Sequence, residues 1–180
     1  MMANAAAFIF QWTDWEVVED IFCWGSEVGI ELSASKDGGM DGQMTDIDLD
    51  TVDVGIDVSF TMAERIDTSN LAIDNGHQGT ERIAIWGRNG HRGAQLSIRG
   101  GSFWGYLNRI VKWEIPGTIS LSQSRVVPSP LSGPMIEVLA GQAMIHDNSV
   151  AIYPRSHPAD PGTAIYIGPS VKSAVVHSSA

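Results

Sequence analysis

Strict alternation of apolar and polar residues over positions 52–62 is the feature that most constrains the fold. The apolar set is Val52, Val54, Ile56, Val58, Phe60 and Met62, and polar residues or glycine stand between them. A period of two predicts a long β-strand with one buried and one exposed face. Residues 46–50 alternate in the opposite phase. One extra residue near Thr51, as a bulge or bend, would bring both apolar sets to the same side.

Further short strands follow the same logic along the chain. Turn signals such as Asn75-Gly76, Gly100-Gly101 and Pro116-Gly117 separate most of them. They are expected at Ala7–Gln11, Glu16–Phe22, Val28–Ser33, Arg82–Trp86, Gln95–Arg99, Tyr106–Ile115, Thr118–Arg125, Met135–Leu139, Val150–Tyr153 and Thr163–Ile167. Many short strands punctuated by Gly and Pro predict an all-β chain, either a β-sandwich or a small barrel.

One short helix is expected near residues 68–74, because Asp67 is a suitable N-cap and Asn75-Gly76 a suitable stop. The 180 residues fit a single β-rich structural domain, 1–180. Two stretches, 33–43 and 126–134, are glycine-rich or proline-rich and are expected to form extended loops or arms. The segment 153–180 is expected to form an extended tail, since three prolines lie within 153–161.

Charge is divided unevenly along the chain. Residues 1–75 hold sixteen acidic and two basic residues, a balance of −14, whereas residues 76–180 hold five acidic and nine basic residues, a balance of +4. Such a division indicates either an acidic surface or association between copies, with arginines of the second half pairing with carboxylates of the first. The candidate interface arginines are Arg88, Arg92 and Arg99.

No motif in the sequence specifies a reaction. The five histidines lack the paired spacing of zinc sites. His146 with Asp147, or His157 with Asp160, would make an acid–base pair, but no nucleophile motif stands near either. The sequence therefore predicts no enzymatic activity, no cofactor and no metal.

A calcium loop is a minor alternative. Asp46, Asp48, Asp50 and Asp57 match several ligand positions of such a loop, although Thr51 occupies the place that requires glycine.

Cys23 is the single cysteine, and its neighbours Phe22 and Trp24 indicate a buried, packed thiol and a reducing site of folding. The first ten residues lack the basic region of a signal peptide, and no apolar stretch approaches the length of a membrane span. The six tryptophans are expected in the core or at an interface, with sugar stacking as the alternative.

Two stretches carry a family resemblance. Val54–Gly76 (VGIDVSFTMAERIDTSNLAIDNG) joins an alternating strand, a polar link and an "NLA" segment closed by Asn-Gly. It resembles the tail tube proteins of long-tailed bacteriophages, and Ile145–Gly168 resembles the C-terminal part of phage structural proteins. The resemblance implies six copies in a ring around a DNA channel, with rings stacked head to tail. By position, it implies that Val52–Met62 forms a channel strand and that Leu71–Ile73 lies in the helix.

The resulting prediction is a virion structural protein, a tail-tube-like subunit assembled in the host cytoplasm. Its partners would be its own copies in a ring and other virion structural proteins, with no membrane, and DNA would pass through without being bound. The proposed channel-facing residues are Asp46, Asp48, Asp50, Asp53 and Asp57. The alternatives are a capsid decoration (cement) protein, a tail connector or terminator, a carbohydrate-binding β-sandwich module, and a small β-fold hydrolase.

Overall fold

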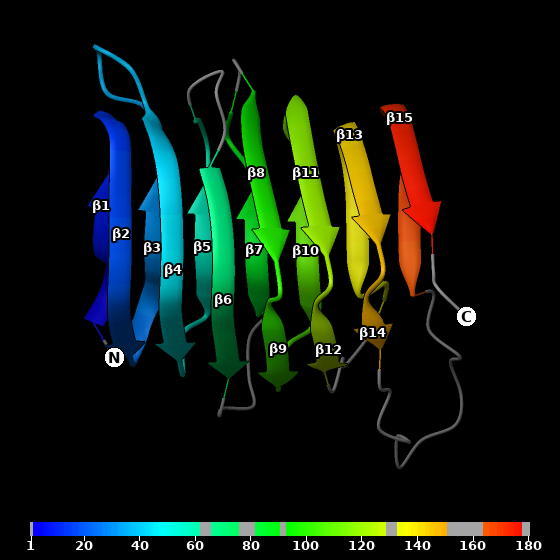
Figure 1. The fold of residues 1–180 in the computed structure, drawn as a ribbon, viewed down its shortest axis with the longest axis horizontal. Helices are drawn as coiled ribbons and strands as arrows, with labels where there is room; N and C mark the ends of the chain where they lie inside the picture. Colours follow the sequence, from blue (N-terminus) through cyan, green and yellow to red (C-terminus); the bar gives the residue numbers. More distant parts are fainter. Residues whose placement is uncertain are drawn as a thin grey trace.

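The chain folds as a β-solenoid in which parallel strands stack coil upon coil along one long axis. This computed structural model describes residues 2–61, 66–75, 82–90, 93–128, 133–150 and 164–177. Figure 1 shows the coils following one another in chain order, from the N-terminus at one end to β15 at the other. Within the described residues the strands are β1 (Met2–Phe10), β2 (Thr13–Trp24), β3 (Ser26–Leu32), β4 (Met40–Asp50), β5 (Val54–Val58), β6 (Ile66–Asn75), β7 (Ile83–Gly87), β8 (Ala94–Arg99), β9 (Ser102–Gly105), β10 (Arg109–Trp113), β11 (Gly117–Ser122), β12 (Arg125–Pro128), β13 (Ile136–His146), β14 (Ser149–Val150) and β15 (Ile165–His177).

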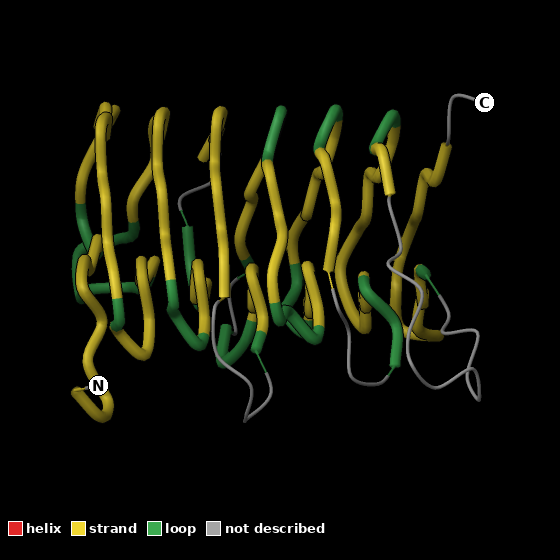
Figure 2. Tube along the Cα trace, turned by 90° about the horizontal axis from the view of Figure 1, so that it is seen from below, coloured by secondary structure: helices red, strands yellow, loops and turns green. Residues whose placement is uncertain are grey.

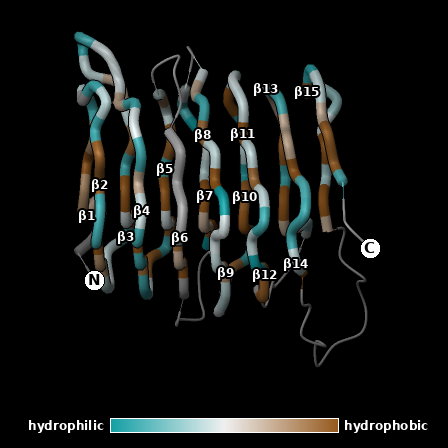
Figure 3. Tube along the Cα trace, viewed as in Figure 1, coloured by the Kyte–Doolittle hydropathy of each residue, from teal (hydrophilic) through white to brown (hydrophobic). Residues whose placement is uncertain are grey.

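The earlier coils contribute one strand to each of two layers, as Figures 1 and 2 show, whereas β13 and β15 each run through both layers. One layer consists of β1, β3, β5, β7, β10 and the first parts of β13 and β15. The other consists of β2, β4, β6, β8, β11 and the later parts of β13 and β15, and it continues past a bend into β9, β12 and β14. Colouring by hydropathy shows more hydrophobic sequence along the layer of β3, β5 and β7 (Figure 3).

The repeat of the solenoid can be read from the strand register. Ile30 pairs with Ile56, Ile56 with Ile85, Ile85 with Val111 and Val111 with Ile136, which are steps of 26, 29, 26 and 25 residues. Parallel strands need a crossover of a dozen or more residues, and here the opposite layer of the coil supplies it. Each coil therefore places one residue in every column of the stack.

The interior is filled by columns of aliphatic side chains. One column contains Phe8, Ile30, Ile56, Ile85, Val111, Ile136 and Ile165. Its central members are fully buried, since Ile30, Ile56 and Ile85 have no solvent exposure. Burial of an isoleucine side chain contributes roughly 1.5–3 kcal/mol, so this column is a principal source of stability.

A neighbouring column holds the largest buried side chain. Gly87 lies between Val58 and Trp113 in the register, and a Cβ atom on Gly87 would lie 2.5 Å from the indole ring of Trp113. The Trp113 indole therefore extends beyond its own coil and fills the space that a side chain at position 87 would occupy. Only a residue without a side chain fits at this position.

The bend within the second layer recurs from coil to coil at equivalent positions. Five residues there have positive φ: Asp20 (57°), Asp46 (55°), Gly100 (73°), Gln123 (51°) and Asp147 (57°). The residue before each of them belongs to one column of the register, which contains Glu19, Thr45, Arg99, Ser122 and His146. The five bend residues therefore occupy equivalent positions in their coils. Asp and Gly are among the residues that adopt this conformation most readily.

The phase change predicted near Thr51 is confirmed. Thr51 has a φ of 57°, and Leu49 before it and Val52 after it are both buried. The residue forms a corner of the coil, so the two apolar sets face one interior from different layers. The strand after it is shorter than predicted, since β5 spans Val54–Val58.

The predicted β-sandwich or small barrel is wrong. Each of the ten further predicted strand segments overlaps a strand of the structure, but the strands pair in parallel with the next coil instead of forming hairpins. Alternation and turn residues do not distinguish these two arrangements. The distinguishing signal is the spacing of about 26 residues between equivalent isoleucines.

The helix predicted near residues 68–74 is also wrong, because this segment lies inside β6. Leu71 and Ile73 are both fully buried, which is the period of two expected for a strand. The strand pairs with β4 on one side and with β8 and β9 on the other, so pairing with neighbouring coils satisfies the backbone. These non-local hydrogen bonds override the local N-cap and stop signals.

The predicted loops and tail differ in part from the structure. Residues 33–39 connect β3 to β4, but β4 begins at Met40. β12 covers the start of the predicted 126–134 loop, and residues 129–132 lie outside the described part of the chain. Within the predicted tail, Ile165–His177 forms β15 and pairs with β13, while residues 153–163 are not described.

Replacement of Ile56 by Ala tests the interior column. We expect the free energy of unfolding to fall by about 2–5 kcal/mol, because the substitution leaves a cavity between Ile30 and Ile85. Ile9→Ala is the matched control, since Ile9 is largely exposed, and its effect should be under about 1 kcal/mol. Urea unfolding followed by circular dichroism measures both values. Equal losses in the two variants would contradict the column as the main stabilising element.

Candidate functional site: an exposed aromatic and acidic corner

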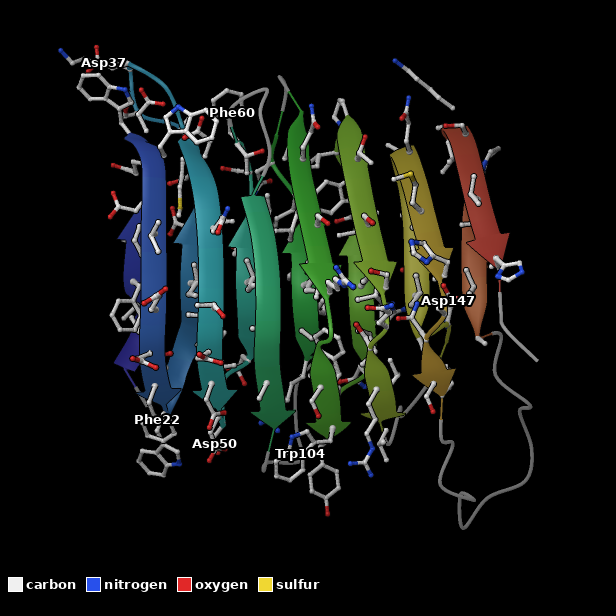
Figure 4. The ribbon with its side chains drawn as sticks, in the orientation of Figure 1. Phe22, Asp37, Asp50, Phe60, Trp104 and Asp147 are labelled. Carbon is white, nitrogen blue, oxygen red and sulfur yellow. The ribbon has the colours of Figure 1, made fainter. Side chains whose placement is uncertain are left out.

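Large aromatic side chains lie exposed where the bent layer meets the corner of the coil. Trp24 is 68% exposed, Phe22 64% and Trp104 49%, and Tyr106 is also exposed. Figure 4 shows Phe22, Asp50 and Trp104 along the same lower edge of the solenoid. Single exposed apolar residues need no explanation, but a group of aromatic residues on one edge indicates a contact surface.

Strand alternation directs these side chains outward. Cys23 and Phe103 point into the core, so their neighbours on either side must face the surface. The same alternation on β4 buries Leu49 and turns Asp48 and Asp50 outward. The term aromatic–acidic corner is used below for Phe22, Trp24, Asp48, Asp50, Trp104 and Tyr106.

The strand register fixes the spacing within the corner. Trp24 pairs with Asp50, Asp50 with Asp74, and Asp74 with Trp104. The two tryptophans therefore share a column and are separated by three strand spacings, about 14–15 Å along the axis. In the adjacent outward column, Phe22 pairs with Asp48.

The carboxylates of the corner influence each other. Partial burial, together with the negative charge of Asp50, raises the pKa of Asp48 above its usual value. Asp50 accepts a hydrogen bond from the Thr51 hydroxyl at 2.7 Å, which orients one of its oxygens. The other proposed channel residue on this strand, Asp46, lies exposed at the bend.

Asp53 and Asp57 lie elsewhere, on the layer of β5, where arginines of the next coil pair with them. Asp57 accepts two short hydrogen bonds from Arg88, from Nη2 at 2.6 Å and from Nε at 3.0 Å. Asp53 accepts from Nε of Arg82 at 3.2 Å, and the Arg82 side chain is buried. These pairs connect acidic and basic parts of the sequence within one chain.

A cation–aromatic network continues this outer face. Arg88 lies 4.0 Å and the Lys112 ammonium 5.0 Å from the centre of the Trp86 ring. The indole Nε1 donates to Glu114 at 2.8 Å, and Lys112 also lies near Glu114. Contacts of this kind stabilise adjacent coils, and they leave Trp86 only half-exposed.

The remaining predicted residues fall into two groups. Arg99 is exposed beside the bend and donates from Nε to Gln123 at 2.7 Å, so it contacts the next coil of its own chain. Arg92, His157 and Asp160 lie outside the described residues. The predicted burial of Cys23 is confirmed, and its Sγ lies 3.1 Å from the Ser26 hydroxyl oxygen.

The predicted pair of His146 and Asp147 lies at the bend near the last coil and includes a third residue. His146 Nδ1 is 3.1 Å and His177 Nδ1 3.6 Å from the Asp147 carboxylate. The hydrogen bond from His146 lowers the pKa of Asp147, against the opposing effect of desolvation. The arrangement holds two imidazoles of adjacent coils around the exposed carboxylate of Asp147, which Figure 4 labels.

The aspartates of the calcium-like spacing do not converge. Asp46, Asp48 and Asp50 belong to β4, whereas Asp57 lies on β5 and pairs with Arg88. Among the residues that the structure describes, no group of three or more His, Cys, Asp or Glu side chains is placed to hold a metal ion.

Sequence reasoning did not identify the aromatic–acidic corner. It assigned the six tryptophans to the core or an interface, with sugar stacking as the alternative, and among those described only Trp113 is fully buried. The signal was present in part, since Phe22 and Trp24 alternate with the buried Cys23. The position of Trp104 in the column of Trp24 depends on coil length, so it could not be predicted from the residues near either tryptophan.

Comparison with known proteins returned no match among protein-family models, curated proteins or solved structures. In the described part of the chain, the structure contains no helix that is long and apolar enough to cross a membrane.

Replacement of Asp57 by Asn tests the ion pair between coils. We expect the free energy of unfolding to fall by about 1–2 kcal/mol, because the substitution removes a charged two-bond contact to Arg88, which keeps partial access to water. Asp20→Asn, at an exposed bend residue, is the control and should change stability by less than about 0.5 kcal/mol. Chemical unfolding measures both variants. An unchanged Asp57→Asn protein would show that the pair is not a stabilising contact.

Replacement of Asp48 by Asn tests the raised pKa. Because the folded state binds the Asp48 proton more tightly than the unfolded state, the charged carboxylate opposes folding at neutral pH. The variant should therefore be more stable at neutral pH, by less than about 1 kcal/mol since the group is largely solvated. The difference in stability between the variant and the wild type should disappear at low pH, where Asp48 is protonated in both the folded and the unfolded state. Thermal unfolding at pH 7 and about pH 3 compares the two proteins; a variant less stable than the wild type at neutral pH would contradict the assignment.

Proposed function

We propose that this chain is a non-catalytic binding module in which the aromatic–acidic corner recognises an extended polysaccharide. The observation that carries the proposal is the pair of exposed indoles, Trp24 and Trp104, held in one column on a rigid solenoid with Asp50 between them. A column of fixed spacing suits a polymer with a repeating unit. The ligand must be longer than one sugar ring to contact both indoles.

The chemistry of the corner fits a sugar chain. An indole offers a flat apolar surface for the C–H face of a pyranose ring, and little conformational entropy is lost on binding. A carboxylate accepts hydrogen bonds from sugar hydroxyls. Phe22 and Asp48 repeat the combination of aromatic ring and carboxylate in the adjacent column.

The charge of the aromatic–acidic corner restricts which polysaccharides are expected to bind. Asp48 and Asp50 make this part of the surface negative, which opposes nucleic acids and other polyanions. Arg125 lies exposed further along, in the outward column of Phe22 and Asp48, but the two carboxylates of Asp48 and Asp50 outnumber its single positive charge. We therefore expect neutral or amino-bearing polysaccharides to bind better than polymers of uronic acids.

A virion structural role is the second candidate. The solenoid changes the form of this proposal: a rod of stacked coils suits a fibre or a surface attachment better than the barrel-lined ring implied by the phage resemblance. The specific observation in its favour is that both end strands expose apolar residues, among them Val17 on β2 and Val175 on β15. The two candidates are compatible, since a fibre of a virion can carry a sugar-binding surface.

Binding of oligosaccharides of increasing length tests the primary proposal. Titration calorimetry and tryptophan fluorescence against neutral, amino-bearing and uronic acid polymers should show affinity that rises with length until both indoles are engaged. Trp24→Ala and Trp104→Ala should each weaken binding by about three- to tenfold, since one aromatic contact contributes roughly 0.5–1.5 kcal/mol.

Trp12→Ala is the matched control, because Trp12 is also exposed but lies just before the start of β2, whereas Trp24 is its last residue. It should bind as the wild type does. Equal loss in all three variants, or no binding to any polymer in the panel, would contradict the proposal. Binding to a protein partner that depends on the same two tryptophans would assign the corner to a protein interface.

A further inference from the structure

The two ends of the solenoid are strand edges whose described residues lack a neighbouring strand. β1 and β2 pair only with β3 and β4, and β15 pairs only with β13. Exposed edges of this kind present unpaired backbone groups that are ready to accept another strand. A cavity of about 270 Å³ lies near the last coil. Mainly apolar residues line it, including Ile145 and Val176.

The exposed apolar residues at the two ends occupy the same columns. Val17, 60% exposed, begins the outward column that ends at Val175, 58% exposed. Ile9 begins the outward column of the other layer, which ends at the exposed Tyr166. If a second copy continued the register, Val17 would pack beside Val175 and Ile9 beside Tyr166.

The interior columns match in the same way. Val18 begins the buried column that ends at Val176, which is half-exposed because no strand lies beyond it in the described chain. In the other layer, Phe8 begins the column that ends at Ile165. A copy placed head to tail would therefore extend both sides of the core without a change of register.

Charge favours the same orientation. β2 carries Asp14, Glu16, Glu19 and Asp20 with no basic residue, whereas β15 carries Lys172 and His177 with no acidic one. Glu19 and His177 begin and end one column. Head-to-head contact would instead oppose two acidic strands, which is unfavourable.

We propose that the β1–β2 end of one chain docks on the β15 end of a second copy, continuing the parallel solenoid as a head-to-tail rod. The interface is heterologous, and because each copy continues the long axis of the one before it, the assembly extends as an open rod and does not close into a ring. This inference goes beyond the sugar-binding proposal and uses different residues.

The experiment blocks each end separately. Val17→Lys with Glu19→Lys blocks the β2 end, and Val175→Lys blocks the β15 end, in each case at exposed positions. The control is Met144→Lys, an exposed residue of the Val175 column that lies one coil further in. Sedimentation velocity over a range of concentrations and negative-stain microscopy measure assembly, and circular dichroism confirms that every variant is folded.

The wild type and Met144→Lys should form rods whose length rises with concentration. Each end-blocked variant alone should be monomeric at concentrations where the wild type assembles, because its dissociation constant for self-association should be at least about tenfold higher than that of the wild type. An equimolar mixture of the two end-blocked variants should form dimers and nothing longer, because one free end of each kind remains.

Three results would overturn the proposal. The first is a wild type that stays monomeric at every concentration. The second is dimerisation of either end-blocked variant by itself, which would indicate an interface between like ends. The third is assembly lost equally in Met144→Lys, which would place the contact on the side of the solenoid.

Discussion

In-register parallel pairing between successive coils is the constraint on which the rest of this structure depends. It places one residue of each coil in every column, so interior columns become ladders of aliphatic side chains such as that of Ile30, Ile56 and Ile85. It also sets the positions of the bends, because Asp46, Gln123 and Asp147 turn the chain at equivalent points. Successive coils along the Ile30 column differ in length by up to four residues, yet the column is preserved.

The same register organises the outer surface. Asp57 and Trp86 share a column in neighbouring coils, and Arg88, two residues after Trp86, pairs with Asp57 and lies over the Trp86 ring. Trp24 and Trp104 lie far apart in sequence and share a column for the same reason. Side-chain interactions across coils thus stabilise one face, while the aromatic and acidic groups of the corner remain exposed.

The stacking also converts the order of charge along the sequence into an order along the long axis. Since the coils follow one another in chain order, the acidic first half lies toward one end and the more basic second half toward the other (Figure 1). Part of the opposite charge is paired inside the chain, as Asp53 with Arg82 shows. The acidic strand β2 and the basic strand β15 lie at the two ends, each with one edge that has no neighbouring strand among the described residues, and this is the basis of the proposed head-to-tail contact.

The sequence by itself determined the local periodicity: the alternation that buries Val54, Ile56 and Val58, the corner at Thr51 and the burial of Cys23 all follow from residues close in sequence. Only the tertiary structure decided which strands pair. Hydrogen bonds between β6 and the coils on either side outweigh the N-cap and stop signals that predicted a helix at 68–74. The aromatic–acidic corner also depends on the tertiary structure. Trp104 lies in the column of Trp24 because of the lengths of the three coils that separate them in sequence. Local patterns carry information about which face of a strand is buried, whereas partner choice depends on the free energy of contacts between residues about 26 positions apart.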